Sequence, residues 1–234
     1  MRKGFNNFLQ KSGLNEIKIL IIVLSIVAGL LIFISIANEV VEGETLSIDD
    51  SILKSLREPN DVSKPAFPDW VTVAMKDITS LGSAAVITLF TLIISGYLLL
   101  RKQYFRLWLV LAATIGGALL MAGLKEFIGR TRPEVVTHLL EENSLSFPSG
   151  HSMMSAVIFL TQAVLLSKIE TNRKVKIYIL SVALLLTFLI GISRIYIGVH
   201  YPTDVLEGWV AGISWALLCW YISTILEKRN KNKG

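Results

Sequence analysis

Cysteine and histidine are scarce in this sequence, and their scarcity excludes two kinds of architecture. The single cysteine in 234 residues, Cys219, leaves no intramolecular disulfide framework. Three histidines are present, and no Asp, Glu and His residues recur at the spacing of metal ligands, which argues against a catalytic metal ion. We therefore expect a protein that uses no disulfide, no metal and no other cofactor.

Long polar stretches are also rare, because 53% of the residues are hydrophobic. Apolar runs of about 20 residues are long enough to cross a bilayer as helices. Six runs are predicted to do so, at 17–37, 81–100, 107–123, 153–166, 177–192 and 205–226. The fourth run reaches the required length only if its helix starts near Ser149. We predict an all-α polytopic membrane protein, with 1–234 as a single domain because the connections are too short for a second one.

The first run follows a basic segment and ends in Ser35-Ile36-Ala37, which resembles the cleavage site of a signal peptide. The run is longer than the apolar core of a typical signal peptide, so we expect an uncleaved helix.

The connection at 38–80 is the long polar segment between the first two predicted spans. It is expected to hold short interfacial helices, one of them amphipathic and a second one at 71–78. The apolar side of the first consists of Ile48, Ile52, Leu53 and Leu56, with Asp49, Asp50, Lys54 and Arg57 opposite. A helix on the membrane surface is the simple interpretation, and a lid or entry gate for a substrate is the alternative.

Positive charge is distributed unevenly. Fifteen of the 23 Lys and Arg residues lie in the amino-terminal segment, in the connections after the second and fourth spans, and in the tail. Cytoplasmic segments of membrane proteins are enriched in Lys and Arg. The pattern predicts a multi-pass plasma-membrane protein with cytoplasmic tails at 1–16 and 227–234. It also explains the net charge of +5 without a nucleic-acid partner.

Three polar segments interrupt the apolar sequence at the ends of predicted spans. They read Lys125-x₆-Arg132-Pro133, Pro148-Ser149-Gly150-His151 and Ser193-Arg194-x₅-His200-x₃-Asp204. Uncompensated charge next to a bilayer is costly and usually serves a function. With cytoplasmic termini, all three segments fall on the extracytoplasmic face, so we expect them to form one site.

His200 and Asp204 are spaced for a pair at the start of the sixth span. A carboxylate that accepts the Nδ1–H of an imidazole fixes its tautomer and leaves Nε2 free as a nucleophile. The alternative for these two residues is helix capping and packing.

The other two segments supply groups suited to an anion. Ser149 is a good N-cap, Gly150 admits close approach of a ligand, and the free N–H groups of a helix start attract phosphate. His151 is placed to protonate a leaving oxygen. Lys125, Arg132 and Arg194 supply fixed positive charges, although Lys125 alone is also explained by snorkelling to the interface.

Several charged residues near these segments are given no catalytic role. Arg130 is interpreted as a loop charge, with a smaller chance of assisting the cations, and Glu207 as a partner of some basic residue. The solvated loop charges are predicted to be Glu126, Glu134, Glu141 and Glu142.

Together the three segments resemble the type 2 phosphatidic acid phosphatase family, which shares its motifs with vanadium haloperoxidases. The family pattern K-x₆-RP, PSGH and SR-x₅-H-x₃-D is matched throughout and in order. The resemblance implies that His200 attacks phosphorus and forms a phosphohistidine, that Asp204 orients His200, and that His151 protonates the leaving oxygen. It implies phosphoryl contacts from Lys125, Arg132, Ser149, Gly150 and Arg194.

The resemblance also implies a metal-independent phosphatase acting on a lipid phosphate in the bilayer. Phosphatidylglycerophosphate and undecaprenyl diphosphate are the leading candidates, and phosphatidic acid is a third. A haloperoxidase is disfavoured because that branch is soluble. A lipid phosphotransferase and a binder or transporter of phosphorylated lipids are the remaining alternatives, and a binder has no need of an oriented nucleophile.

Overall fold

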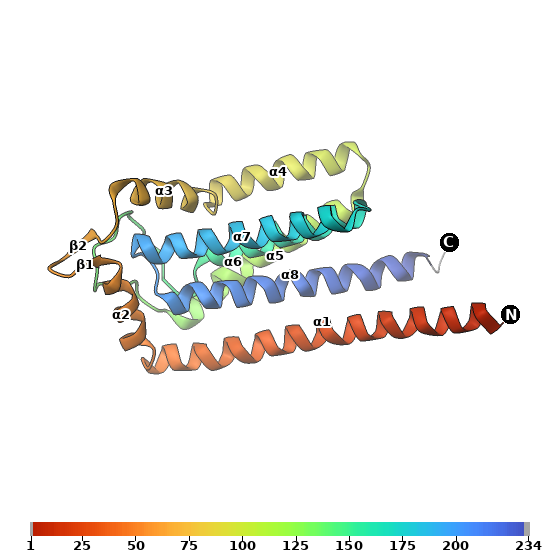
Figure 1. The fold of residues 1–234 in the computed structure, drawn as a ribbon, viewed down its shortest axis with the longest axis horizontal. Helices are drawn as coiled ribbons and strands as arrows, with labels where there is room; N and C mark the ends of the chain where they lie inside the picture. The colour runs from red at the N-terminus through yellow and green to blue at the C-terminus, as the bar shows by residue number, and fades with distance from the viewer. Residues whose placement is uncertain (1, 232–234) are drawn as a thin grey trace.

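Helices make up most of the chain in the computed structural model, which describes the backbone of residues 2–231 (Figure 1). The side chains of residues 2–16, 18, 168 and 228–231 are outside this description. The helices are α1 (Arg2–Glu42), α2 (Leu46–Ser55), α3 (Asp69–Ser80), α4 (Ala84–Leu100), α5 (Tyr104–Ile128), α6 (Gly150–Ile169), α7 (Arg173–Ile197) and α8 (Pro202–Lys231). An antiparallel hairpin of β1 (Arg57–Glu58) and β2 (Asp61–Pro65) joins α2 to α3.

The predicted all-α membrane architecture is confirmed. Within the described residues, five helices are long and apolar enough to cross a membrane, and α3 with α4 forms a sixth span if that bent pair is counted as one. The pair bends by 46° between Ser80 and Ala84, where Ser83 caps α4 by accepting a hydrogen bond from the Val86 N–H (3.3 Å). The helix α6 begins at Gly150, before the predicted apolar run at 153–166, and so reaches the length needed to cross a bilayer.

The central helix of the bundle is α6, which packs against α5, α7 and α8. Its closest approach is to α8. A Cβ added to Gly208 would lie 2.7 Å from the Ser149 carbonyl oxygen, and one added to Gly212 would lie 2.5 Å from the Met153 carbonyl oxygen. The two backbones therefore touch, which is possible only because these positions of α8 have no side chain.

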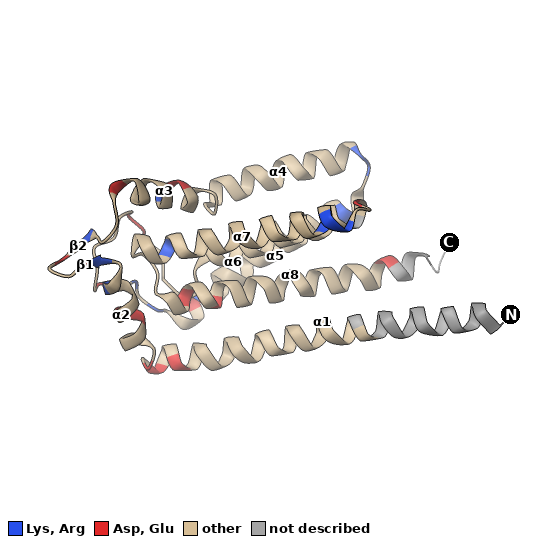
Figure 2. Cartoon of the chain, viewed as in Figure 1, with Lys and Arg blue, Asp and Glu red and all other residues tan. Residues whose placement is uncertain are grey.

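All three motif segments meet at one end of the bundle, together with α2, the hairpin and the start of α3 (Figure 1). Lys and Arg gather at the opposite end, at the α4–α5 connection and the first turn of α7 (Figure 2). The side chains of the predicted tails 1–16 and 227–234 lie outside the described residues, apart from Glu227.

The connection at 38–80 forms two helices as predicted, but Asp49 was placed on the wrong side of α2, because it faces the protein together with Leu53. Asp49 is fully buried, whereas Ile48 and Ile52 are 65% and 40% exposed. The inward-facing residues of α2 are Asp49 and Leu53, whereas Lys54, from the expected polar side, is exposed. Asp49 pairs with Arg130, and the neighbouring Arg57, also buried, donates to the Tyr196 carbonyl oxygen (3.0 Å).

Candidate active site

A cavity of about 330 Å³ lies where the three motif segments meet. Six of the eight predicted site residues line it, namely Lys125, Arg132, Gly150, His151, Arg194 and His200. The other two, Ser149 and Asp204, are fully buried and are not part of the lining. The side away from the charges is apolar and is formed by α4, α5 and α6 through Ile87, Ala118, Met121 and Met154.

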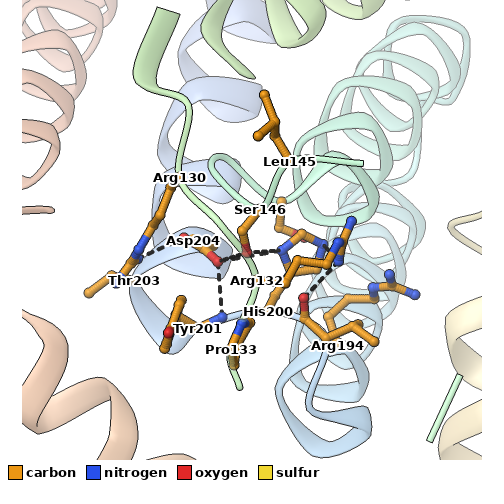
Figure 3. A network of polar contacts seen from close by, with 12 residues as sticks. Arg130, Arg132, Pro133, Leu145, Ser146, Arg194, His200, Tyr201, Thr203 and Asp204 are labelled. Carbon is orange, nitrogen blue, oxygen red and sulfur yellow. Dashed lines mark hydrogen bonds and ion pairs between the residues drawn. The ribbon is translucent and has the colours of Figure 1, made fainter. Parts of the chain in front are cut away.

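His200 lies in the short turn between α7 and α8 (Figure 3). The turn begins at Gly198, whose φ of +85° suits glycine, and α8 starts at Pro202. The Nδ1 atom of His200 is 3.5 Å from the Asp204 Oδ2 atom. The same Oδ2 accepts hydrogen bonds from the Tyr201 N–H (2.9 Å) and from the Ser146 hydroxyl, so Asp204 is held on the Nδ1 side of the ring.

The opposite ring nitrogen faces the cations. The Nε2 atom of His200 lies 3.3 Å from Arg132 Nη1. Burial, together with the positive charges of Arg194, Arg132 and Lys125, lowers the pKa of His200 well below its ordinary value. The imidazole is therefore neutral at physiological pH, with Nε2 available as a nucleophile.

Arg132 is fixed by three groups of the protein. Its Nε and Nη2 donate to the carbonyl oxygen (2.6 Å) and the hydroxyl oxygen (3.0 Å) of Ser144. Its Nη1 donates to the Val199 carbonyl oxygen (2.7 Å). Lys125 reaches the same segment from the last turn of α5, donating to the Leu145 carbonyl oxygen and to Ser144 Oγ (3.3 Å). The loop before α6 thus orients both cations toward the cavity.

Arg194 is 1% exposed in the last turn of α7. Its Nη1 donates to Thr79 Oγ1 (3.2 Å), and its Nη2 donates to Glu142 Oε1 (2.7 Å). Its Nε–H has no hydrogen-bond partner within the described structure. A buried guanidinium with a free donor at the edge of a cavity is suited to bind an anionic ligand.

Glu142 was predicted to be a solvated loop residue, and the structure contradicts this. Besides the bond to Arg194, its Oε2 lies 3.7 Å from Arg132 Nη2. Burial alone would raise the pKa of Glu142, but the hydrogen bond and charge of Arg194, with the charge of Arg132, hold that pKa below its usual value. A carboxylate therefore neutralises part of the cationic cluster of Lys125, Arg132 and Arg194, called the cage below.

The start of α6 is organised as a capped helix. Ser149 Oγ accepts from the Ser152 N–H (3.4 Å) and lies 3.0 Å from the Ser152 hydroxyl, while the Ser149 N–H donates to the Asp204 carbonyl oxygen (2.9 Å). Gly150 and His151 reach the cavity. A Cβ at Gly150 would lie 2.7 Å from the Met121 sulfur, so a side chain here would intrude on the wall of the cavity.

Arg130, predicted to be a loop charge, forms part of the site's support. Its side chain is 8% exposed and makes ion pairs with Asp204 and Asp49, each at 2.8 Å. Arg130 does not line the cavity, and its closeness in sequence to Arg132 was the available signal. Ser146 and Ser144 were also missed, and no sequence pattern marks them.

Two further residues near the site, Glu207 and Ser193, do not line the cavity. Glu207, expected to pair with a basic residue, is fully buried, and neither of its carboxylate oxygens has a hydrogen-bond partner in the described part of the chain. Ser193 donates to the Ile190 carbonyl oxygen of its own helix (2.6 Å) and does not line the cavity. Over the described residues, no three Asp, Glu, His or Cys side chains form a cluster that could hold a metal ion.

Comparison with known proteins gives a consistent result. The PAP2 superfamily profile matches residues 106–227, which include all three motif segments. Phosphatidylglycerophosphatase B of Bacillus subtilis is 34% identical over 190 residues, covering 78% of this chain and 87% of that protein. Undecaprenyl-diphosphatase of Sulfolobus acidocaldarius is 40% identical over 81 residues, which is 34% of each chain.

The fold is similar to a solved membrane structure. The crystal structure of a transmembrane PAP2 type phosphatidylglycerolphosphate phosphatase from Bacillus subtilis superposes with a TM-score of 0.74 at 30% identity. The match covers 86% of this chain and 96% of that one. The similarity therefore extends over most of the chain and not the motif segments alone.

Proposed function

Because the chain belongs to the PAP2 superfamily and is a lipid phosphate hydrolase, we propose that it works through a phosphohistidine formed on His200. The observation that carries this proposal is the orientation of His200 between Asp204 and the cage. Its Nδ1 lies 3.5 Å from the buried Asp204 carboxylate and 3.3 Å from Ser146 Oγ, and its Nε2 lies 3.3 Å from Arg132 Nη1 in the cavity. A site that only binds phosphate needs the cations but has no need of this carboxylate.

In the first step, Nε2 attacks phosphorus, the P–N bond forms, and the bond from phosphorus to the leaving oxygen breaks. Arg132, Arg194 and Lys125 stabilise the charge on the equatorial oxygens, because they are fixed before the substrate arrives. Phosphate displaces Glu142 from Arg194 as it enters. Asp204 stabilises the imidazolium that develops on His200.

His151 handles the proton on the opposite side of the phosphoryl group. A bound phosphate beside it favours the imidazolium form, which donates its proton to the leaving oxygen. In the second step, the neutral His151 takes a proton from water, the water oxygen attacks phosphorus, and the P–N bond to His200 breaks. Inorganic phosphate and the regenerated histidine pair are the products.

The proposed substrates are phosphatidylglycerophosphate and undecaprenyl diphosphate. The two relatives named after these activities support the pair. The shape of the cavity supports a lipid, because its charged end continues into an apolar side between α4, α5 and α6. A headgroup at the cage would place its hydrocarbon tail among the helices.

We place the site on the extracytoplasmic face. The basic connections at 101–106 and 173–176 lie at the end of the bundle opposite the cage (Figure 2), and such segments face the cytoplasm in most membrane proteins. This orientation puts both termini in the cytoplasm. This orientation can be checked with single cysteines at the α2–α3 connection or at the α4–α5 connection, in a chain in which Cys219 is replaced. In intact cells an impermeant reagent should label the α2–α3 cysteine, and labelling of the α4–α5 cysteine alone would contradict the orientation.

The decisive experiment is phosphate release by purified enzyme from the two lipids side by side, with EDTA present and His200→Ala as the blank. We expect release that EDTA does not suppress and that His200→Ala abolishes, while the variant still binds substrate. Acid-labile, base-stable label on His200 after rapid quench would identify the intermediate. Substantial turnover by His200→Ala would refute the nucleophile, and inhibition by EDTA would require a metal. Transfer of phosphate to an added alcohol in place of water would instead indicate a phosphotransferase.

A further inference from the structure

A buried polar network lies behind the dyad of His200 and Asp204, outside the cavity (Figure 3). At its centre is Arg130, whose Nη1 donates to Asp204 Oδ1 and to Thr203 Oγ1, both at 2.8 Å. Its Nη2 donates to Asp49 Oδ2, also at 2.8 Å. The guanidinium carbon lies 4.0 Å above the centre of the Tyr201 ring, which fixes the plane of the fork. Arg130 therefore has a single arrangement in which both buried carboxylates are satisfied.

Asp49 belongs to α2, far from the motif segments in sequence. Its carboxylate is fully buried and accepts two hydrogen bonds from Thr203, in the first turn of α8, in addition to the ion pair with Arg130. The Thr203 N–H donates to Oδ1 (3.1 Å), the Thr203 hydroxyl donates to Oδ2 (2.6 Å), and the ion pair with Arg130 completes the set. Asp49 thus caps the first turn of α8, the turn that holds Asp204, with a side chain from another part of the chain.

The two carboxylate oxygens of Asp204 have different hydrogen-bond partners. Oδ2 faces His200 Nδ1 and also accepts from Ser146 and from the Tyr201 N–H. Among the contacts of the described residues, Oδ1 is held by Arg130 alone. Rotation of this carboxylate is therefore limited on one side by Arg130, whose own position depends on Asp49.

We propose that Asp49 is a positioning residue for the phosphatase reaction, acting on His200 through Arg130, Thr203 and Asp204. The inference rests on the proposed function, in which His200 is the nucleophile. Without the Asp49 charge, Arg130 has a buried donor with no anionic partner. Its fork then turns both donors toward Asp204, since a bidentate pair is the favoured geometry. This draws the carboxylate away from Nδ1 and leaves the imidazole free to tilt.

The expected consequence falls on the chemical step and not on binding. Displacement of a reacting group by about 1 Å costs on the order of 100-fold in rate. The cage is untouched, because Asp49 and Arg130 make no contact with Lys125, Arg132 or Arg194 in the described structure. The neutral variant Asp49→Asn should therefore slow formation of the phosphohistidine by roughly 10- to 100-fold. Binding of the substrate should change by less than about threefold.

The matched control is Asp50→Asn, which removes the same charge from the next residue of α2. Asp50 has no hydrogen bond to Arg130 or Thr203, and its Oδ1 has no hydrogen-bond partner within the described residues. The rate of phosphohistidine formation is measured by rapid quench with radiolabelled phosphatidylglycerophosphate or undecaprenyl diphosphate. Binding of unreacted substrate is measured in the His200→Ala background, with and without Asp49→Asn.

Each outcome decides the matter. A slow step with intact binding supports the inference, and a wild-type rate in Asp49→Asn overturns it. Equal losses of rate and of binding would show a general loss of structure and would also overturn it. If wild-type enzyme releases phosphate without labelling His200, the proposed nucleophile fails, and the inference fails with it for that separate reason.

If Asp49→Asn does not fold, Thr203 offers a milder test of the same link. Thr203→Val removes the hydroxyl that contacts both Asp49 and Arg130 while keeping the shape of the side chain and the N–H. We expect slower phosphohistidine formation in Thr203→Val and rescue in Thr203→Ser, which restores the hydroxyl. Equal rates in the valine variant and the wild type would overturn the proposal.

Discussion

Replacing Glu142 with glutamine tests how the empty cage is balanced. Glu142 neutralises Arg194, whose guanidinium is buried, and it lies close to Arg132. The Nη2 atom of Arg194 donates to Glu142, and a phosphate oxygen bound to this Nη2 would lie about 3 Å from the nitrogen, in the place of the carboxylate. The incoming phosphate must therefore displace a carboxylate and remain near its charge. Glu142→Gln removes that competitor, so inorganic phosphate should bind more tightly.

The size of the effect follows from the charges and their separation. Two unit charges roughly 5 Å apart repel by about 3 kcal/mol at an effective dielectric constant of about 20, and by less than about 1 kcal/mol in bulk water. The Glu142 side chain is 28% exposed, which places it between these limits. We take about 1.4 kcal/mol, which corresponds to roughly tenfold tighter binding of phosphate.

The assay is inhibition of lipid phosphate hydrolysis by inorganic phosphate, together with thermal unfolding over a phosphate titration. Without phosphate the variant should be less stable than the wild type, because a buried Arg194 loses its counter-charge. Added phosphate should recover the loss. Glu141→Gln is the matched control, since Glu141 is exposed and makes no contact with the cage. Phosphate affinity that is unchanged or weaker in Glu142→Gln would refute the idea that the carboxylate competes with the substrate.

Three other predictions concern Arg194, His200 and the contact of α6 with α8. Arg194→Lys should lower kcat/KM by about 100-fold or more, because an ammonium cannot reproduce the bonds to Thr79 and a phosphate oxygen together; a near-normal rate would reduce Arg194 to a structural residue. The pKa of His200 is lowered in the folded state, so kcat/KM should begin to fall only below about pH 6.5, and a fall that begins above that pH would contradict the neutral nucleophile. The same shift means that the unfolded chain takes up a proton at His200 more readily, so the free energy of unfolding should decrease as the pH falls below about 6.5. Gly208→Ala should destabilise the protein by about 1–3 kcal/mol in thermal unfolding, whereas Gly96→Ala, where an added Cβ meets nothing within 4 Å, should not; equal effects would argue against tight contact of α6 with α8.

Prediction from the sequence succeeded where one physical constraint dominated. A bilayer demands long apolar helices, so the spans were recognisable, and the start of α6 at Gly150 followed from the length that its apolar run lacked. The motif segments converge because consecutive spans return to the same side of the membrane. For this reason Lys125, Arg132, His151, Arg194 and His200 were expected to lie close together, and they line one cavity.

The sequence failed where a residue's role depends on a partner distant along the chain. Asp49 has the period of a polar helix face, and only its contact with Arg130 shows that this side chain points inward. Glu142 is one of two adjacent acidic residues in a polar loop, and nothing local distinguishes it from the exposed Glu141. Glu207 has no partner among the described residues, which no rule of charge pairing would predict.

Because α6 and α8 are in backbone contact, the groups proposed to react are held by different helices from most of the apolar residues of the cavity. The helix starts that hold His151 and Asp204 pack backbone against backbone, because Gly208 and Gly212 place no side chain between them. The apolar side of the cavity comes largely from other helices, through Ile87 of α4 and Ala118 and Met121 of α5, with Met154 as the contribution of α6. Residues that contact the hydrocarbon tail can therefore vary without moving the reacting groups. With the proposed function, such a division would let the same reacting groups serve lipids as different as a diacylglycerol derivative and a polyprenol.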